Sequence, residues 1–223
     1  MESKIVGNAL SGLRCLISVA SLACASSSLA ADASIELTTV FSGATRGLEL
    51  GVEYEPSDQL TLGASAERRW RVPNSAERAS GYELEVEWVP LNPIPSISLG
   101  ASLSYAYGTE REAVSPKLRE HEAVLQAVVQ WQAHPIVKVK AKAGPGFEKN
   151  NDGWDQAGKY DLSLSVDLTR TLEFEWSVAD GDYASPTHKV DLGWLISDAY
   201  EVTIGYAFRK DDPLWSITIE RSW

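Results

Sequence analysis

Polar and apolar residues alternate along most of the chain after residue 34, with a period of two. Clear examples are the segments GLELGVEYE (47–55), YELEVEW (82–88), SISLGASLSYAY (96–107), YDLSLSVDL (160–168), LEFEWSV (172–178), YEVTIGYAF (200–208) and WSITIERSW (215–223). Weaker alternation adds residues 34–42, 59–70, 120–132, 136–147 and 187–196. Successive side chains of a strand point to opposite faces, so this period indicates β-structure. The sequence therefore predicts an all-β chain of about 12 strands.

The predicted connections alternate in length. Short ones comprise residues 56–59, 90–95, 133–135, 169–170 and 197–199, whereas longer, more polar ones comprise 71–80, 108–119, 149–157 and 180–186. The connections at 43–46 and 210–213 belong to the second group by position, although they are short. Short turns at one end and longer loops at the other are typical of bacterial outer-membrane barrels. We therefore expect a single antiparallel up-and-down transmembrane β-barrel over residues 31–223.

The first thirty residues have the features of a secretory signal peptide. Lys4 and Arg14 provide basic charge, residues 15–25 form an apolar run, and a small-x-small cleavage motif ends at Ala30. Cleavage there would remove both cysteines, so the remaining chain would have no thiol for a disulfide or a metal. A lipoprotein acylated at Cys24 is an alternative. We expect export to the bacterial outer membrane.

Three features favour a membrane barrel over a soluble barrel or sandwich, in which the apolar face would be inside. Small residues are frequent on the polar face, as suits a confined lumen, and segments of about 9–11 residues can cross the hydrocarbon when tilted. Aromatic residues stand near the segment ends, like the interfacial girdles of membrane barrels. These aromatic residues are Tyr54, Trp70, Tyr82, Trp88, Tyr105, Tyr107, Trp131, Tyr200, Phe208, Trp215 and Trp223.

The terminal segment WSITIERSW resembles the last strand of Gram-negative outer-membrane proteins, which ends in an aromatic residue after alternating apolar positions. Trp215, Ile217, Ile219 and Trp223 match this pattern, whereas Arg221 departs from it. The resemblance implies that the barrel-assembly machinery recognises the strand ending at Trp223. In length and strand number the chain is most similar to the small twelve-stranded porins of the oligogalacturonate-specific family. This similarity is in architecture only, because those porins are expected to have a basic pore lining.

The charged residues occupy the polar face of the predicted strands. With 31 acidic and 20 basic residues the net charge is −11, which disfavours a nucleic-acid partner. If the apolar rows face lipid, the pore-lining residues are Glu36, Glu49, Glu53, Glu83, Glu85, Glu87, Lys138, Lys140, Lys142, Glu173, Glu175 and Arg209. The three lysines alternate in VKVKAKAG (137–144) and form a ladder. We expect this ladder to face the glutamates of the first two strands, or to pair with Glu122, Asp161 and Asp167 on adjacent strands.

These rows of charge predict a narrow lumen that contains water, because isolated charges in a dry interior are costly. The function expected is a porin-like channel for passive or weakly selective passage of small hydrophilic solutes, with cation preference from the acidic lumen. One alternative is a closed structural or adhesive barrel whose loops bind a partner. The translocator of an autotransporter is disfavoured, because residues 31–223 contain neither a passenger nor a helix to thread the pore.

A further alternative is a lipid-modifying hydrolase of the outer membrane. Its candidate histidines would be His121, His134 and His188, but no serine follows His121 or His188 two residues later. The loops at 149–158 and 180–183 are similar to calcium loops but lack the full oxygen-ligand spacing. We therefore expect no catalytic residue, no metal site and no cofactor.

Overall fold

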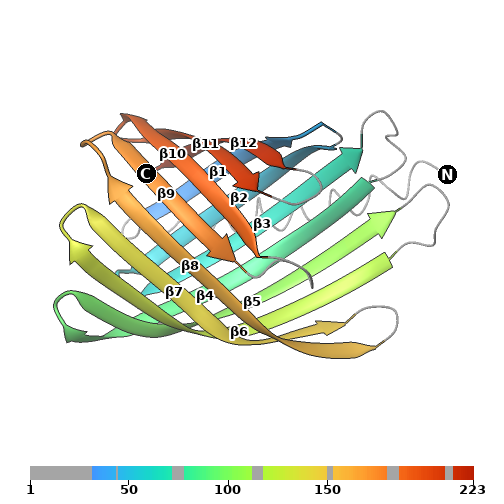
Figure 1. The fold of residues 1–223 in the computed structure, drawn as a ribbon, viewed down its shortest axis with the longest axis horizontal. Helices are drawn as coiled ribbons and strands as arrows, with labels where there is room; N and C mark the ends of the chain where they lie inside the picture. Colours follow the sequence, from blue (N-terminus) through green and yellow to red (C-terminus); the bar gives the residue numbers. More distant parts are fainter. Residues whose placement is uncertain are drawn as a thin grey trace.

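The computed structural model describes residues 32–43, 45–71, 78–111, 118–149, 153–179, 186–208 and 213–223. The strands are β1 (Asp32–Phe41), β2 (Thr45–Ser57), β3 (Leu60–Arg71), β4 (Arg78–Ile94), β5 (Ile97–Arg111), β6 (Leu118–His134), β7 (Val137–Lys149), β8 (Trp154–Asp167), β9 (Leu172–Ala179), β10 (Thr187–Ser197), β11 (Tyr200–Phe208) and β12 (Leu214–Ser222). Each strand pairs antiparallel with its neighbours in sequence, and β1 pairs with β12, which closes the sheet into a barrel (Figure 1). The predicted up-and-down barrel of twelve strands is confirmed.

The two ends of the barrel differ, as the connection lengths predict. Short turns join β2 to β3, β4 to β5 and β6 to β7 at one end, where β12 also ends. We call this the turn end, and the opposite end the loop end. No helix in the described ranges is long and apolar enough to span a membrane. The predicted signal peptide, residues 1–30, lies outside the described residues.

Strands β4 to β8 are longer than the alternation predicts. β4 continues through Pro90 and Pro93 to Ile94, and its pairing with β5 shifts register twice beyond Trp88. Bulged pairing accommodates prolines, which have no N–H to donate, so the turn expected at 90–95 is mostly strand. This corrects the predicted connection.

β8 likewise begins earlier than expected. The Asn- and Asp-rich sequence at 149–158 predicts a loop, but Lys149 pairs with Trp154 and only four residues connect the strands. Gly153, which directly precedes β8, has a φ of 147°, in the region that favours glycine.

Large apolar side chains form a belt on the outer surface. Tyr82, Leu84, Val86 and Trp88 alternate along β4 and are 42%, 51%, 43% and 56% exposed. On β5, residues from Ile97 to Tyr107 span about 33 Å of strand, or roughly 25 Å of height at a typical barrel tilt. That height matches the apolar band of transmembrane barrels. The predicted outward direction of the apolar rows is confirmed.

Candidate functional site

The strand register places the predicted pore-lining residues on the inward face. On β4, Glu83, Glu85 and Glu87 alternate with the exposed apolar residues. Glu36 of β1 stands opposite Glu220 of β12 and Gly51 of β2, so these positions share a face. The same inward series contains Glu49, Glu53, Lys138, Lys140, Lys142, Glu173 and Glu175. Arg209 lies outside the described residues.

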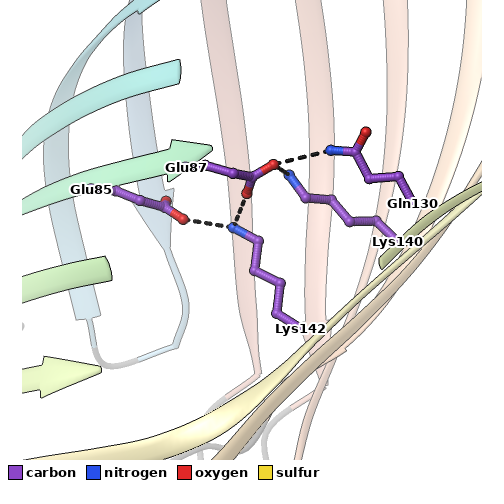
Figure 2. Close-up of polar contacts among 5 residues, drawn as sticks. All are labelled: Glu85, Glu87, Gln130, Lys140 and Lys142. Atoms are coloured by element: carbon purple, nitrogen blue, oxygen red, sulfur yellow. Dashed lines mark hydrogen bonds and ion pairs between the residues drawn. The ribbon is translucent and has the colours of Figure 1, made fainter. Parts of the chain in front are cut away.

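Two lysines of β7 meet two glutamates of β4 inside the barrel. Lys142 Nζ is 2.6 Å from Glu85 Oε1 and 2.8 Å from Glu87 Oε2, and Lys140 Nζ is 2.7 Å from Glu87 Oε1. Gln130 Nε2 of β6 donates a hydrogen bond of 3.0 Å to Glu87 Oε1. Figure 2 shows the lysine and glutamate side chains reaching toward one another from separate strands. We call Glu85, Glu87, Lys140 and Lys142 the lysine–glutamate bridge.

The bridge corrects one prediction. Lys140 and Lys142 form their ion pairs not with carboxylates of adjacent strands but with β4, from which β5 and β6 separate them. The inward residues of the intervening strands lie beneath the bridge: Ser102 of β5 is in register with Glu87, and Val128 of β6 is in register with Lys142. Ser102 of β5 and Val128 of β6 are only 3% and 1% exposed beside the bridge.

A second ion pair connects β8 with β6. Lys159 Nζ is 2.8 Å from Glu122 Oε1, and the intervening β7 has Gly146 at this level. A side chain at Gly146 would meet the aliphatic part of Lys159, so the glycine leaves room for the pair. Sequence reasoning missed Lys159 because it started this strand at residue 160. Extending the alternation back by one residue places Lys159 in the series of Asp161.

Acidic residues on β1 and β2 have fewer cationic partners. In the described part of the chain, Glu36, Glu49 and Glu53 form no ion pair with lysine or arginine. Lys189 instead pairs with Asp191 of its own strand at 3.1 Å. The bridge thus uses two lysines of the ladder, while the wall formed by β1 and β2 retains excess negative charge.

Two polar cavities lie along the inner wall. The cavity near the turn end has a volume of about 480 Å³, and the one near the loop end about 310 Å³. Polar residues lining the first include Ser98, Gln130, Lys138, Lys140, Ser163, Ser165 and Glu173. Charged residues lining the second are Glu49, Glu67, Arg69, Glu83, Glu120, Glu122 and Glu148. On β7, the first cavity is lined by Lys138 and Lys140 and the second by Glu148. Lys142 lies between these positions, so the bridge lies between the two cavities along the barrel.

The histidines do not form a hydrolytic arrangement with a serine in the described residues. His121 Nδ1 is 2.8 Å from Tyr105 Oη, and the ring of His188 stacks on Trp176 at 6.1 Å between centroids. Both histidines share the outward series with apolar residues, and His134 lies at the turn end of β6. Among the described residues no group of three or more His, Cys, Asp or Glu side chains could hold a metal. Of the candidate calcium loops, residues 150–152 and 180–183 lie outside the description.

Comparison with solved structures identifies proteins of similar fold. No protein-family model and no curated protein sequence matches the chain. KdgM porin in complex with disordered oligogalacturonate has 12% sequence identity and a TM-score of 0.63, over 85% of this chain and 99% of that one. NanC porin has 10% identity and a TM-score of 0.59, over 85% and 98%. The translocator domain of autotransporter NalP from Neisseria meningitidis has 11% identity and a TM-score of 0.56, over 97% of each chain. The chain therefore shares the closed barrel fold of small outer-membrane porins, and the predicted similarity in architecture is confirmed.

Proposed function

We propose that this protein is an outer-membrane channel for small hydrophilic solutes, with a preference for cations. One observation carries the proposal: the barrel has an exposed apolar belt outside and charged, cavity-containing surfaces inside. This is the reverse of a soluble barrel and suits lipid outside with water inside. The fold shared with KdgM and NanC porins supports the same conclusion.

The pairing of the lumen charges supports cation preference. Lys140 and Lys142 are held in ion pairs with Glu85 and Glu87, so the positive charge of the ladder is largely neutralised locally. Glu36, Glu49 and Glu53 on the wall formed by β1 and β2 have no ion-pair partner among the described residues, and they then set the sign of the field along the lumen. Rings or rows of carboxylates favour cations in a pore.

Recording from planar lipid bilayers with a KCl gradient tests the proposal. We expect single-channel steps and a reversal potential of the sign that potassium flow produces. Glu49→Gln combined with Glu53→Gln should shift that potential toward zero, whereas Lys138→Gln should shift it the other way. A wild-type reversal potential that favours chloride would contradict the cation preference.

A closed structural barrel is a second candidate, which the lysine–glutamate bridge itself favours. Ion pairs across the inner wall narrow the lumen, and satisfied charges do not require a continuous water path. In that case the folded protein would insert into bilayers without producing current steps, and loops at the loop end would bind a partner. Conductance therefore separates the two candidates.

A further inference from the structure

The outward face of the barrel is free of acidic residues at its described strand positions. Aspartates and glutamates of the strands alternate with the exposed apolar residues and therefore belong to the inward series. The outward series does contain bases, and they stand at the ends of strands. Arg46, Arg68 and Lys149 lie at the loop end, and Arg221 lies at the turn end. A chain with a net charge of −11 thus presents only cationic charge to its surroundings on this face.

One of the loop-end bases, Lys149, lies within a row of aromatic residues. In the strand register, Tyr82 of β4 pairs with Tyr107 of β5, and Tyr107 pairs with His121 of β6. His121 in turn pairs with Lys149 of β7, which pairs with Trp154 of β8. Ring centroids are 5.2 Å apart for Tyr82 and Tyr107, and 4.8 Å apart for Tyr107 and His121. Lys149 Nζ lies 5.5 Å from the centroid of the Trp154 ring, and Trp154 is 65% exposed.

Further arginines occupy neighbouring backbone positions. Arg68 of β3 is paired in register with Ser80, which is the next outward position beyond Tyr82. Arg78 pairs with Arg111, and Arg119 pairs with Thr109. Basic residues therefore follow the loop ends of consecutive strands from β2 to β7. We call Arg46, Arg68 and Lys149 the basic rim.

No residue of the basic rim has a carboxylate partner in the part of the chain that the structure describes. Over the described ranges, neither Arg68 nor Lys149 forms an ion pair, and Arg46 donates to the backbone carbonyl groups of Ser42 and Thr45. An outward cation is costly in hydrocarbon but favourable at the level of headgroups, which is also where tyrosine and tryptophan rings gather. Phosphate is the anion that suits such a rim, because guanidinium and ammonium groups donate strong charge-assisted hydrogen bonds to it.

We propose that the basic rim binds the phosphate groups of phosphorylated glycolipids in the surrounding leaflet. The inference rests on the outward orientation in the proposed function, but it does not require the lumen to conduct. The net negative charge of the chain opposes any general attraction to anionic lipid, so binding must be local to the rim. The apolar belt below it contacts the acyl chains of the same lipid.

Binding of bisphosphorylated lipid A to the folded, detergent-solubilised chain tests the proposal by native mass spectrometry. Dephosphorylated lipid A is the matched ligand. The double variant Arg68→Gln/Lys149→Gln should lower affinity for the phosphorylated lipid roughly 30-fold, since each cation near an anionic lipid surface contributes a factor of about five. Arg221→Gln, an outward arginine at the opposite end, is the matched control and should leave affinity nearly unchanged. Arg68→Lys/Lys149→Arg should retain binding.

Two outcomes would overturn the proposal. One is equal affinity of the wild-type chain for phosphorylated and dephosphorylated lipid. The other is a loss with Arg221→Gln as large as that with the rim variant. Neither outcome bears on the proposed channel function. That proposal is contradicted instead if the folded protein inserts into bilayers without conducting. Far-ultraviolet circular dichroism of each variant checks that the barrel is folded. We expect every variant to fold, because the side chains of the basic rim are exposed and do not take part in closing the barrel.

Discussion

Replacing Lys142 by methionine should destabilise the barrel by removing the centre of the lysine–glutamate bridge. Lys142 bonds Glu85 at 2.6 Å and Glu87 at 2.8 Å, and its side chain is only 15% exposed. Methionine keeps the length of the side chain but has no charge. Glu87, whose side chain is 8% exposed, would keep Lys140 as a partner, while Glu85 would lose its ion pair among the described residues.

The magnitude follows from burial. Removing one partner of a buried ion pair costs about 3–5 kcal/mol. Glu85 is 37% exposed toward the lumen, and Lys140 still compensates Glu87. We therefore expect the free energy of unfolding to fall by about 2–3 kcal/mol, somewhat less than for a fully buried pair.

Urea unfolding in lipid vesicles, followed by tryptophan fluorescence, measures this loss. Lys138→Met is the matched control, because it makes the same change on the same face of β7 at a lysine without an ion pair in the described residues. The control should lose less than about 1 kcal/mol. A double-mutant cycle between Lys142→Met and Glu87→Gln should give a coupling energy of about 1–3 kcal/mol.

A coupling energy near zero would refute the reasoning, even if Lys142→Met alone were destabilising. Equal losses of unfolding free energy in the Lys138 and Lys142 variants would also refute the reasoning. The effect would then come from the charge or the aliphatic contacts that all lysines of the ladder share, and not from the ion pairs of Lys142. In bilayers, Lys142→Met should also raise the single-channel conductance more than Lys138→Met, because Lys142 takes part in the ion pairs that narrow the lumen, whereas Lys138 forms no ion pair in the described residues.

Two other predictions test orientation and close packing. Leu103→Arg should destabilise the membrane-inserted barrel by about 2–4 kcal/mol, because Leu103 is 54% exposed in the apolar belt, whereas Ser104→Arg on the inward face should cost clearly less. Similar unfolding energies for this pair would argue against lipid contact with the outer face. Gly144→Ala should cost about 1–3 kcal/mol, because its Cβ would meet the backbone of β6, while Gly108→Ala has open space; thermal unfolding of the two variants should differ accordingly.

Much of the fold is readable from local pattern. The alternation in YELEVEW places Glu83, Glu85 and Glu87 on one face and Tyr82 and Trp88 on the other, whatever the strand pairs with. The ends of the strands are harder to predict from the sequence. Prolines near the end of β4 and turn-forming residues near Trp154 both indicate a loop, although the strands continue there. The basic rim was not predicted from the sequence either. Its residues come from different strands, and only the strand register shows that they lie at the same end of the barrel.

The sequence by itself determined the number of strands, the face of each side chain and the acidic character of the interior, because these depend on residue type and on a period of two. Only the tertiary structure decided that Lys142 of β7 meets Glu87 of β4 and that Lys159 passes Gly146 to reach Glu122. Which side chains meet inside a barrel depends on closure, register and strand tilt, which set the distance across the lumen. Those quantities belong to the whole sheet and have no counterpart in the alternation of any one strand.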